Sequence, residues 1–239
     1  MKTWVVGDIH GAHKALLQVL DRAKFDYKKD ELIVLGDVVD GWTETKQCIN
    51  ELLKIKHLIM IIGNHDLWAW DWMKHGTLEP LWTSQGGKNT IKSYGGDFCS
   101  VPESHIKFLK DANQYYIDEE NRLFVHGGID PNYPIEQQHI DVLTWDRDLF
   151  SNARKKEFFS IGIPDAKKQM TPFKEIFIGH TTTQIFEDSC RPLHYCEIWN
   201  LDTGGGWSGK LTMMNVDTKE YVQSDWVYEL YPNEKGRKG

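Results

Sequence analysis

The chain has 239 residues, 40% of them hydrophobic and 26% charged, with a net charge of −7 at pH 7. This length and composition are typical of a soluble globular protein with one large domain or two small ones. The acidic balance argues against nucleic-acid and anionic-membrane partners. No apolar run approaches the roughly 18 to 20 residues of a membrane span.

Short apolar runs that end in small polar clusters organise the first part of the chain. The runs are TWVV before GDIHG (7–11), LIVL before GDVVDG (36–41) and LIMII before GNHD (63–66). Residues 12–25 and 43–55 carry apolar side chains at helical spacing, with Thr43 as the predicted N-cap of the second helix. Alternating strands and helices predict a parallel sheet, in which ligands gather at the carboxyl ends of the strands.

The later part of the chain has a less regular pattern. We expect two more buried strands, RLFV before HGG (126–128) and EIFI before GHTT (179–182). Residues 102–112 are predicted as a helix and residues 114–125 as a hairpin. Segments near 80–100 and 131–172 are predicted as irregular insertions. The late strands, within 197–206 and 210–223, are predicted to form a second sheet.

Each polar cluster places a candidate metal ligand at a strand end. Asp8 and His10 are two residues apart, so in an extended segment they point the same way. The other candidates follow later strands: Asp37, Asn64, His126 and His180. Imidazole and carboxylate together suit Mn, Fe or Zn better than Ca. Six ligands exceed one tetrahedral zinc and suit two divalent ions that share Asp37.

Each of these side chains has a simpler interpretation when it is taken alone. A single Asp or His at a strand end is commonly a cap or a satisfied polar group, and HGG by itself is only a turn. The simpler interpretation needs five independent coincidences, all at strand ends, so the metal site is the better prediction. Two divalent ions would leave a positive remainder on this ligand set, which suits an anionic phosphate.

The ordered set GDIHG, GDVVDG, GNHD, HGG and GH resembles the calcineurin-like metallophosphoesterases. It is most similar to their phosphoprotein-phosphatase branch, which includes bacterial Ser/Thr protein phosphatases and diadenosine tetraphosphatases. The stretch WTSQGGKNTIKSYGG (82–96) resembles a segment of the bacterial members. The resemblance implies an α/β (α+β) fold, a four-layer αββα sandwich of two mixed β-sheets flanked by helices. Residues 1–230 would form the catalytic domain, and residues 231–239 a flexible tail.

The resemblance also implies a division of labour among the site residues. One metal ion would be held by Asp8 and His10, the other by Asn64, His126 and His180, with Asp37 bridging both. A metal-bridging water or hydroxide would attack phosphorus directly. His65 would protonate the leaving oxygen and Asp40 would orient His65, in agreement with general acid chemistry. Two Mn ions are the expected cofactors, with Fe or Zn as alternatives.

One position departs from the family pattern. The second motif of the family usually reads GD-x-x-D-R-G, but Gly41 stands here where a phosphate-clamping Arg is expected. A bidentate Arg is a strong phosphate ligand, so its loss leaves the substrate class open. Arg147 is the candidate for a second phosphate-binding Arg; the alternative is a surface Arg paired with Asp146 or Asp148. The candidates to replace the missing charge are Lys88, Arg154, Lys155 and Lys156.

Three further positions have two interpretations each. Asp66 either belongs to the site or caps a helix that begins at Leu67. Trp68 and Trp72 either pack in the core, which is the preferred interpretation, or offer a platform for a nucleobase. Asp202 either supports the site from behind or only closes a turn in its glycine-rich segment.

The leading hypothesis is a Ser/Thr protein phosphatase-like enzyme that hydrolyses phosphomonoesters. One alternative is hydrolysis of a dinucleoside polyphosphate such as diadenosine tetraphosphate, or of another nucleotide, with a base pocket formed by residues 132–172. An alternative of another class is a catalytically inactive metal-binding or interaction module. The apolar run near the N-terminus is too short for a signal-peptide core, so we expect a cytoplasmic protein. The physiological substrate, the native metal and the oligomeric state stay open.

Overall fold

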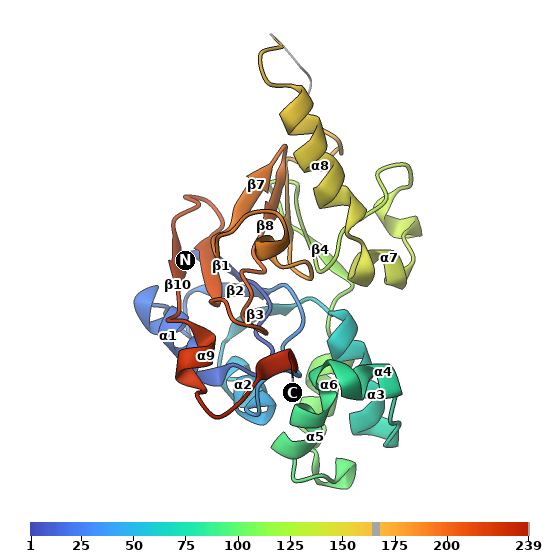
Figure 1. The fold of residues 1–239 in the computed structure, drawn as a ribbon, viewed down its shortest axis with the longest axis vertical. Helices are drawn as coiled ribbons and strands as arrows, with labels where there is room; N and C mark the ends of the chain where they lie inside the picture. The colour runs from blue at the N-terminus through green and yellow to red at the C-terminus, as the bar shows by residue number, and fades with distance from the viewer. Residues whose placement is uncertain (164–167, 239) are drawn as a thin grey trace.

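Two five-stranded mixed sheets form the centre of the computed structural model, which describes residues 1–163 and 168–238 (Figure 1). The first sheet has the order β10-β9-β1-β2-β3, with β1 at Thr3–Val6, β2 at Glu31–Val34, β3 at His57–Met60, β9 at Thr212–Asn215 and β10 at Tyr221–Gln223. The second has the order β4-β5-β6-β8-β7, with β4 at Tyr115–Ile117, β5 at Arg122–Val125, β6 at Glu175–Ile178, β7 at Leu193–Tyr195 and β8 at Ile198–Asn200.

The strands that lead into the polar clusters are parallel to one another within each sheet. In the first sheet β1 pairs with β2 and β2 with β3, so Val6 lies beside Val34 and Val34 beside Met60. In the second sheet β6 is parallel to both β5 and β8. The carboxyl ends of these strands therefore lie together at one edge of each sheet, as the sequence pattern predicts.

Alternation of side chains along the strands places one apolar face of each sheet against the other. Val5, Ile33 and Met214 from the first sheet are fully buried in one cluster with Phe124 and Phe177 from the second. The rings of Phe124 and Phe177 are stacked with their centroids 4.9 Å apart. This cluster is the core between the two sheets and holds them in a fixed relation.

Helices cover the outer faces and complete the four-layer αββα sandwich that the resemblance implies. The first sheet is covered by α1 (His13–Arg22), α2 (Thr45–Leu52), α3 (Asn64–His75), α6 (Glu103–Lys110) and the short α9 (Val227–Leu230). The second is covered by α7 (Ile140–Trp145) and α8 (Asp148–Phe159), and α8 projects from the body of the molecule in Figure 1. Within the described residues, no helix combines the length and the apolar character needed to cross a membrane.

Several sequence predictions need correction. The strands β9 and β10 do not join the second sheet, because Val5 of β1 pairs with Met214 of β9 and extends the first. Thr43 is not an N-cap; its backbone N–H and its hydroxyl both donate to the carboxylate of Glu234. The two segments predicted as irregular contain helices: α4 (Pro80–Trp82), a π-helical turn Thr83–Gly87 and α5 (Lys88–Ser93) in one, and α7 and α8 in the other. Residues 164–167 lie outside the described part.

The segment predicted as a flexible tail packs against the domain over its described part. Tyr231 is buried, and its ring stacks on Trp42 with the centroids 5.0 Å apart. The backbone N–H of Arg237 donates to the carbonyl of Gly206. The prediction was wrong for these residues because their partners lie far away in the sequence. Residue 239 is outside the described residues.

Candidate active site

Loops that follow five parallel strands bring all six predicted metal-ligand side chains to one buried place. His10 Nε2 lies 3.9 Å from Asp8 Oδ2 and 3.6 Å from Asp37 Oδ2. His126 Nε2 lies 3.4 Å from Asp37 Oδ2 and 3.2 Å from the side-chain oxygen of Asn64. The ring of His180 lies 5.1 Å from that of His126. Asp37 is thus central to the cluster.

The backbone of the site is strained. The φ angles of His10, Asp37, Asp40 and His180 are 48°, 49°, 70° and 66°, a left-handed region that side-chain-bearing residues rarely adopt. Asp8 and His10 therefore converge by a sharp turn after β1 and not by the extended geometry that the sequence suggests. Turns of this kind aim consecutive polar side chains into one place, at an energetic cost that the surrounding packing must offset.

Asp66 ties the third of these loops to the second. Its carboxylate accepts hydrogen bonds from the backbone N–H groups of Asp37, Val38 and Gly63, at 2.8, 3.0 and 3.0 Å. Helix α3 begins at Asn64 and not at Leu67, so Asp66 caps the helix from its first turn. The same carboxylate therefore caps α3 and fixes the loop that carries Asp37.

The buried donor atoms fit a pair of divalent ions. Two groups of side chains, Asp8–His10–Asp37 and Asp37–His126–His180, each place their ligand atoms within 4.8 Å of one another. Asp37 Oδ2 and His180 Nε2 are buried without a hydrogen-bond partner among the described residues. Unsatisfied buried polar atoms are costly, and cations bound to them would remove that cost.

Hydrogen bonds to the backbone fix two imidazoles in the orientation that metal binding requires. His10 Nδ1 lies 3.0 Å from the carbonyl of Val39, and His126 Nδ1 lies 2.6 Å from that of Leu35. A carbonyl only accepts, so each Nδ1 carries the proton. In the neutral form of each ring, Nε2 then has a lone pair directed into the cluster, as in proteins where a second contact sets the metal-binding nitrogen.

Charge crowding in the cluster also favours cations. Burial raises the pKa of Asp8 well above its usual value, and the neighbouring Asp202 carboxylate raises it further. Burial alone would raise the pKa of Asp37, but His126 and His65 hold it well below its usual value. Asp202 closes a turn by accepting from the N–H of Gly204, and its buried carboxylate lies near enough to Asp8 to affect the pKa of that group.

His65 and Asp40 form a buried pair beside the ligand set. His65 Nδ1 lies 2.6 Å from Asp40 Oδ2, while His65 Nε2 is buried without a partner among the described residues. Burial raises the pKa of Asp40 to about 8, although hydrogen bonds from the Thr90 hydroxyl and the Trp82 indole N–H oppose this rise. Burial also lowers the pKa of His65 to about 3. The free Nε2 of His65 is the atom that can exchange a proton with a reacting group.

A cavity of about 310 Å³ opens next to the ligand set. It is lined by His180, by Arg147 at the start of α8, and by Arg237 near the C-terminus, with Gln85 and Trp207 on its walls. Burial lowers the pKa of Arg147, and the charge of Arg237 lowers it further. Asp146, one of the two partners suggested for Arg147, instead accepts from the N–H of Leu149, and Arg147 lines the cavity. The cavity thus offers two cationic side chains beside candidate metal ligands.

The family model for calcineurin-like phosphoesterases matches residues 1–198. The chain belongs to this family. It is therefore a metal-dependent hydrolase of phosphoric esters, and the family implies divalent metal ions as its cofactors.

Two curated relatives align along most of the chain. The symmetrical bis(5′-nucleosyl)-tetraphosphatase of Pseudomonas fluorescens is 25% identical, with 92% of this chain and 93% of the relative covered. Serine/threonine-protein phosphatase 1 of Salmonella typhimurium is also 25% identical, with 89% and 91% covered. A crystal structure described provisionally as a diadenosine tetraphosphatase superposes with a TM-score of 0.67 at 18% identity, covering 93% of this chain and 92% of that one. This structural similarity is evidence for the fold of the chain alone.

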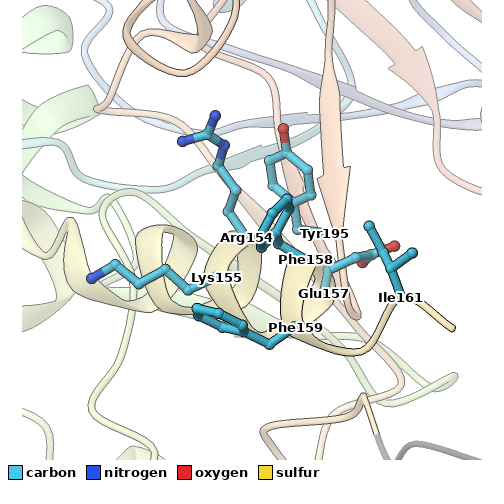
Figure 2. A pocket seen from close by; sticks show the side chains of 7 residues that line it. All are labelled: Arg154, Lys155, Glu157, Phe158, Phe159, Ile161 and Tyr195. Carbon is cyan, nitrogen blue, oxygen red and sulfur yellow. The ribbon is translucent and has the colours of Figure 1, made fainter. Parts of the chain in front are cut away.

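The cationic residues suggested as replacements for the missing Arg are placed differently in this phosphoesterase. Arg154 and Lys155 line another cavity of about 480 Å³ on α8, where Figure 2 shows Arg154 beside Tyr195. Lys156 donates to the carbonyl of Gln169. None of these three residues lines the cavity beside His180, which is lined instead by Arg147 and Arg237. Lys88, at the start of α5, does not line that cavity either.

The tryptophans that follow the third motif belong to the packing of the phosphoesterase. Trp72 is buried, and its ring lies 6.0 Å from that of Trp82. Trp68 packs its ring edge-on against His65 at 5.3 Å and against Trp145 at 5.2 Å. Trp72 is therefore unavailable to a nucleobase, and Trp68 fixes the ring of His65.

Sequence reasoning missed the side chains that hold Asp40. The indole N–H of Trp82 donates to Asp40 Oδ2 at 2.7 Å, and the hydroxyl of Thr90 donates to Asp40 Oδ1 at 2.7 Å. Both residues lie in the stretch 82–96, whose resemblance to bacterial relatives was the available signal. Arg237 was also missed, since the segment that carries it was predicted to be flexible.

Thr90→Val is expected to destabilise the phosphoesterase. The Thr90 hydroxyl also accepts from the backbone N–H of Asp40 at 2.8 Å, so the isosteric Val leaves buried polar atoms of Asp40 without partners. Loss of these hydrogen bonds lowers the free energy of unfolding by roughly 1–3 kcal/mol. For a chain of this size, that change lowers Tm by roughly 3–10 °C. Calorimetry measures the shift, with Thr77→Val, at an exposed position, as the matched control. Equal Tm values for the two variants would contradict this role.

Proposed function

We propose that this phosphoesterase hydrolyses phosphomonoesters, with phosphorylated Ser and Thr side chains of proteins as its substrates. The observation that carries the proposal is the convergence of two candidate metal groups on Asp37, with His65 beside them. The similarity to the Salmonella protein phosphatase over 89% of the chain supports this substrate class.

The residues present are suited to hold two divalent ions, for which we propose Mn, with Fe or Zn as alternatives. One ion would be held by Asp8 and His10, the other by Asn64, His126 and His180, with Asp37 shared. When bound, the two ions would supply Lewis-acid activation of water and of the phosphate group.

Proton transfer and the binding of the phosphate group are proposed for other side chains of the site. Burial raises the pKa of Asp40 to about 8, so the His65–Asp40 pair holds one titratable proton near neutral pH. With Asp40 protonated and donating to Nδ1, the proton of the ring lies on Nε2, which has no other partner among the described residues and faces the leaving oxygen. Asp40 keeps the ring in place, and is itself fixed by Thr90 and Trp82. Arg147 lines the adjoining cavity and is positioned to bind phosphate oxygens.

The proposal is tested by comparing substrates side by side with Mn-loaded protein. We expect release of phosphate from a phosphoserine or phosphothreonine peptide, and from a simple aryl phosphate, at a higher kcat/KM than from diadenosine tetraphosphate. Rapid turnover of the dinucleotide with no turnover of the peptide would overturn the proposed substrate.

A dinucleoside tetraphosphate is the second candidate substrate. The Pseudomonas fluorescens relative is named as a bis(5′-nucleosyl)-tetraphosphatase, and it is as similar to this chain as the protein phosphatase is. The cavity beside His180 also combines two guanidinium groups with Trp207, which suits a polyphosphate with an attached base. The segment 132–172, predicted to form a base pocket, does contribute Arg147 to this cavity; residues 132–136 instead line a separate one.

The alternative of an inactive metal-binding module is not supported. The six candidate ligands, His65 and Asp40 are all buried at one place, and a protein without catalysis has no need for the free Nε2 of His65. Metal analysis with an aryl phosphate assay checks this: bound metal without release of phosphate would favour the inactive module.

A further inference from the structure

Arg237 reaches the candidate active site from the last residues of the chain. Its Nη1 lies 3.4 Å from His10 Nε2, and its Nη2 donates to Gln85 Oε1 at 3.0 Å. The guanidinium stacks over the ring of Trp207, with 4.7 Å from its carbon to the ring centroid. In Figure 1 the chain runs from α9 to the C-terminus on the surface of the domain. The turn Gly236–Lys238 contacts the π-helical turn Thr83–Gly87, which carries Gln85. Arg237 therefore lies at the edge of the ligand set.

The guanidinium of Arg237 retains capacity to bind an anion. Its Nε is buried without a hydrogen-bond partner among the described residues. Arg237 and Arg147 line the same cavity beside His180, and the charge of Arg237 disfavours the charged form of Arg147. Two like charges at one cavity repel each other, and an anion placed between them would remove that repulsion.

Space for Arg237 exists because two neighbouring positions are glycines. A Cβ at Gly41 would lie 3.3 Å from Arg237 Cγ, and a Cβ at Gly206 would lie 3.0 Å from Arg237 Cδ. Gly41 is the position where the family pattern has Arg. A side chain at Gly41 and the observed side chain of Arg237 would therefore compete for the same space.

The rest of the terminal segment is held without the guanidinium. Tyr231 stacks on Trp42, Glu234 accepts from Thr43, and the backbone N–H of Arg237 donates to Gly206. These contacts fix the position of the backbone. The backbone of the segment therefore does not depend on the guanidinium, whose Nε still has no partner among the described residues.

We propose that Arg237 is a substrate-binding residue that, together with Arg147, binds the phosphate group of the substrate in place of the Arg missing at Gly41. This inference rests on the proposed function, because the anion is the phosphate group that the enzyme hydrolyses. Arg presents its N–H donors in a planar fork that matches two phosphate oxygens at once. The terminal segment thereby becomes part of the substrate site.

Arg237→Ala in the full-length, Mn-loaded protein tests the proposal. We expect the dissociation constant for inorganic phosphate, measured by titration calorimetry, to rise roughly 10- to 100-fold, as for loss of hydrogen bonds to a charged group. KM for an aryl phosphate should rise with it. Metal content should stay at the wild-type value, because Arg237 is not a proposed ligand. The variant should still unfold in one cooperative transition, because Tyr231, Glu234 and the backbone of residue 237 hold the segment. Arg237→Lys keeps the charge without the fork and should recover only part of the affinity.

Lys235→Ala is the matched control, since it removes one positive charge from an exposed position two residues away. It should bind phosphate within about twofold of the wild type, because an exposed charge contributes little. Equal phosphate affinity of Arg237→Ala and Lys235→Ala, or loss of metal along with phosphate in Arg237→Ala, would overturn the inference alone. A wild-type protein that neither binds phosphate nor hydrolyses the aryl ester would overturn the proposed function as well.

Discussion

Asp37→Asn is expected to abolish phosphoesterase activity and to lower the bound metal at the same time. Asp37 is common to both candidate ligand groups, and its Oδ2 has no other partner among the described residues. Removing its negative charge weakens the binding of both proposed ions at once. We expect a loss of activity of roughly 10³-fold or more, because bound metals supply several kcal/mol of transition-state stabilisation. Elemental analysis of the purified protein together with an aryl phosphate assay measures both effects.

The control for this variant is Asp21→Asn, which makes the same change at an exposed position on α1. It should retain wild-type metal content and activity. Because Asp37 Oδ1 also accepts from the backbone N–H of His65 at 3.0 Å, circular dichroism should confirm that α3 is intact. An Asp37→Asn protein that keeps activity would show that the shared-carboxylate arrangement is wrong.

His65→Asn is expected to keep the metals and lose catalytic rate. His65 contacts the cluster through ring packing, with its centroid 5.1 Å from that of His10, and belongs to neither ligand group. Loss of a general acid costs roughly 10²- to 10⁴-fold in kcat. The loss should be large for an alkyl phosphate, whose leaving oxygen needs a proton, and small for an aryl phosphate with an acidic leaving group.

His139→Asn is the matched control, because the His139 side chain is exposed and its hydrogen-bond and ion-pair partner among the described residues is Asp141, far from the ligand groups. Its kcat should equal that of the wild type. Two results would speak against His65 as the acid. One is equal rate loss for good and poor leaving groups, and the other is loss of metal from His65→Asn.

Most of the candidate site could be predicted from local sequence. Each candidate ligand lies within a few residues of the end of a strand, and parallel strands place their carboxyl ends at one edge. The order of the motifs in the sequence was therefore sufficient to predict that Asp8, Asp37 and Asn64 lie close together in space. The family and the two-sheet fold were predicted correctly for the same reason.

The side chains that donate hydrogen bonds to Asp40 could not be predicted in the same way. Trp82 and Thr90 lie more than one helix beyond Asp40 in the chain, within a stretch that was predicted to be irregular. Their hydrogen bonds depend on how α4 and α5 fold back over the second loop. No local pattern encodes that return.

Local sequence was sufficient to indicate the family, the candidate ligands with Asp37 as the one common to both groups, and the absence of the expected Arg at Gly41. Only the tertiary structure decided that β9 pairs with β1 and that Arg237 arrives beside Gly41. The physical reason is the range of the interactions. A strand and the loop after it are fixed by neighbouring residues. Arg237 instead reaches His10 across 227 positions of the chain, held by Trp207, by the carbonyl of Gly206 and by the stacking of Tyr231 on Trp42.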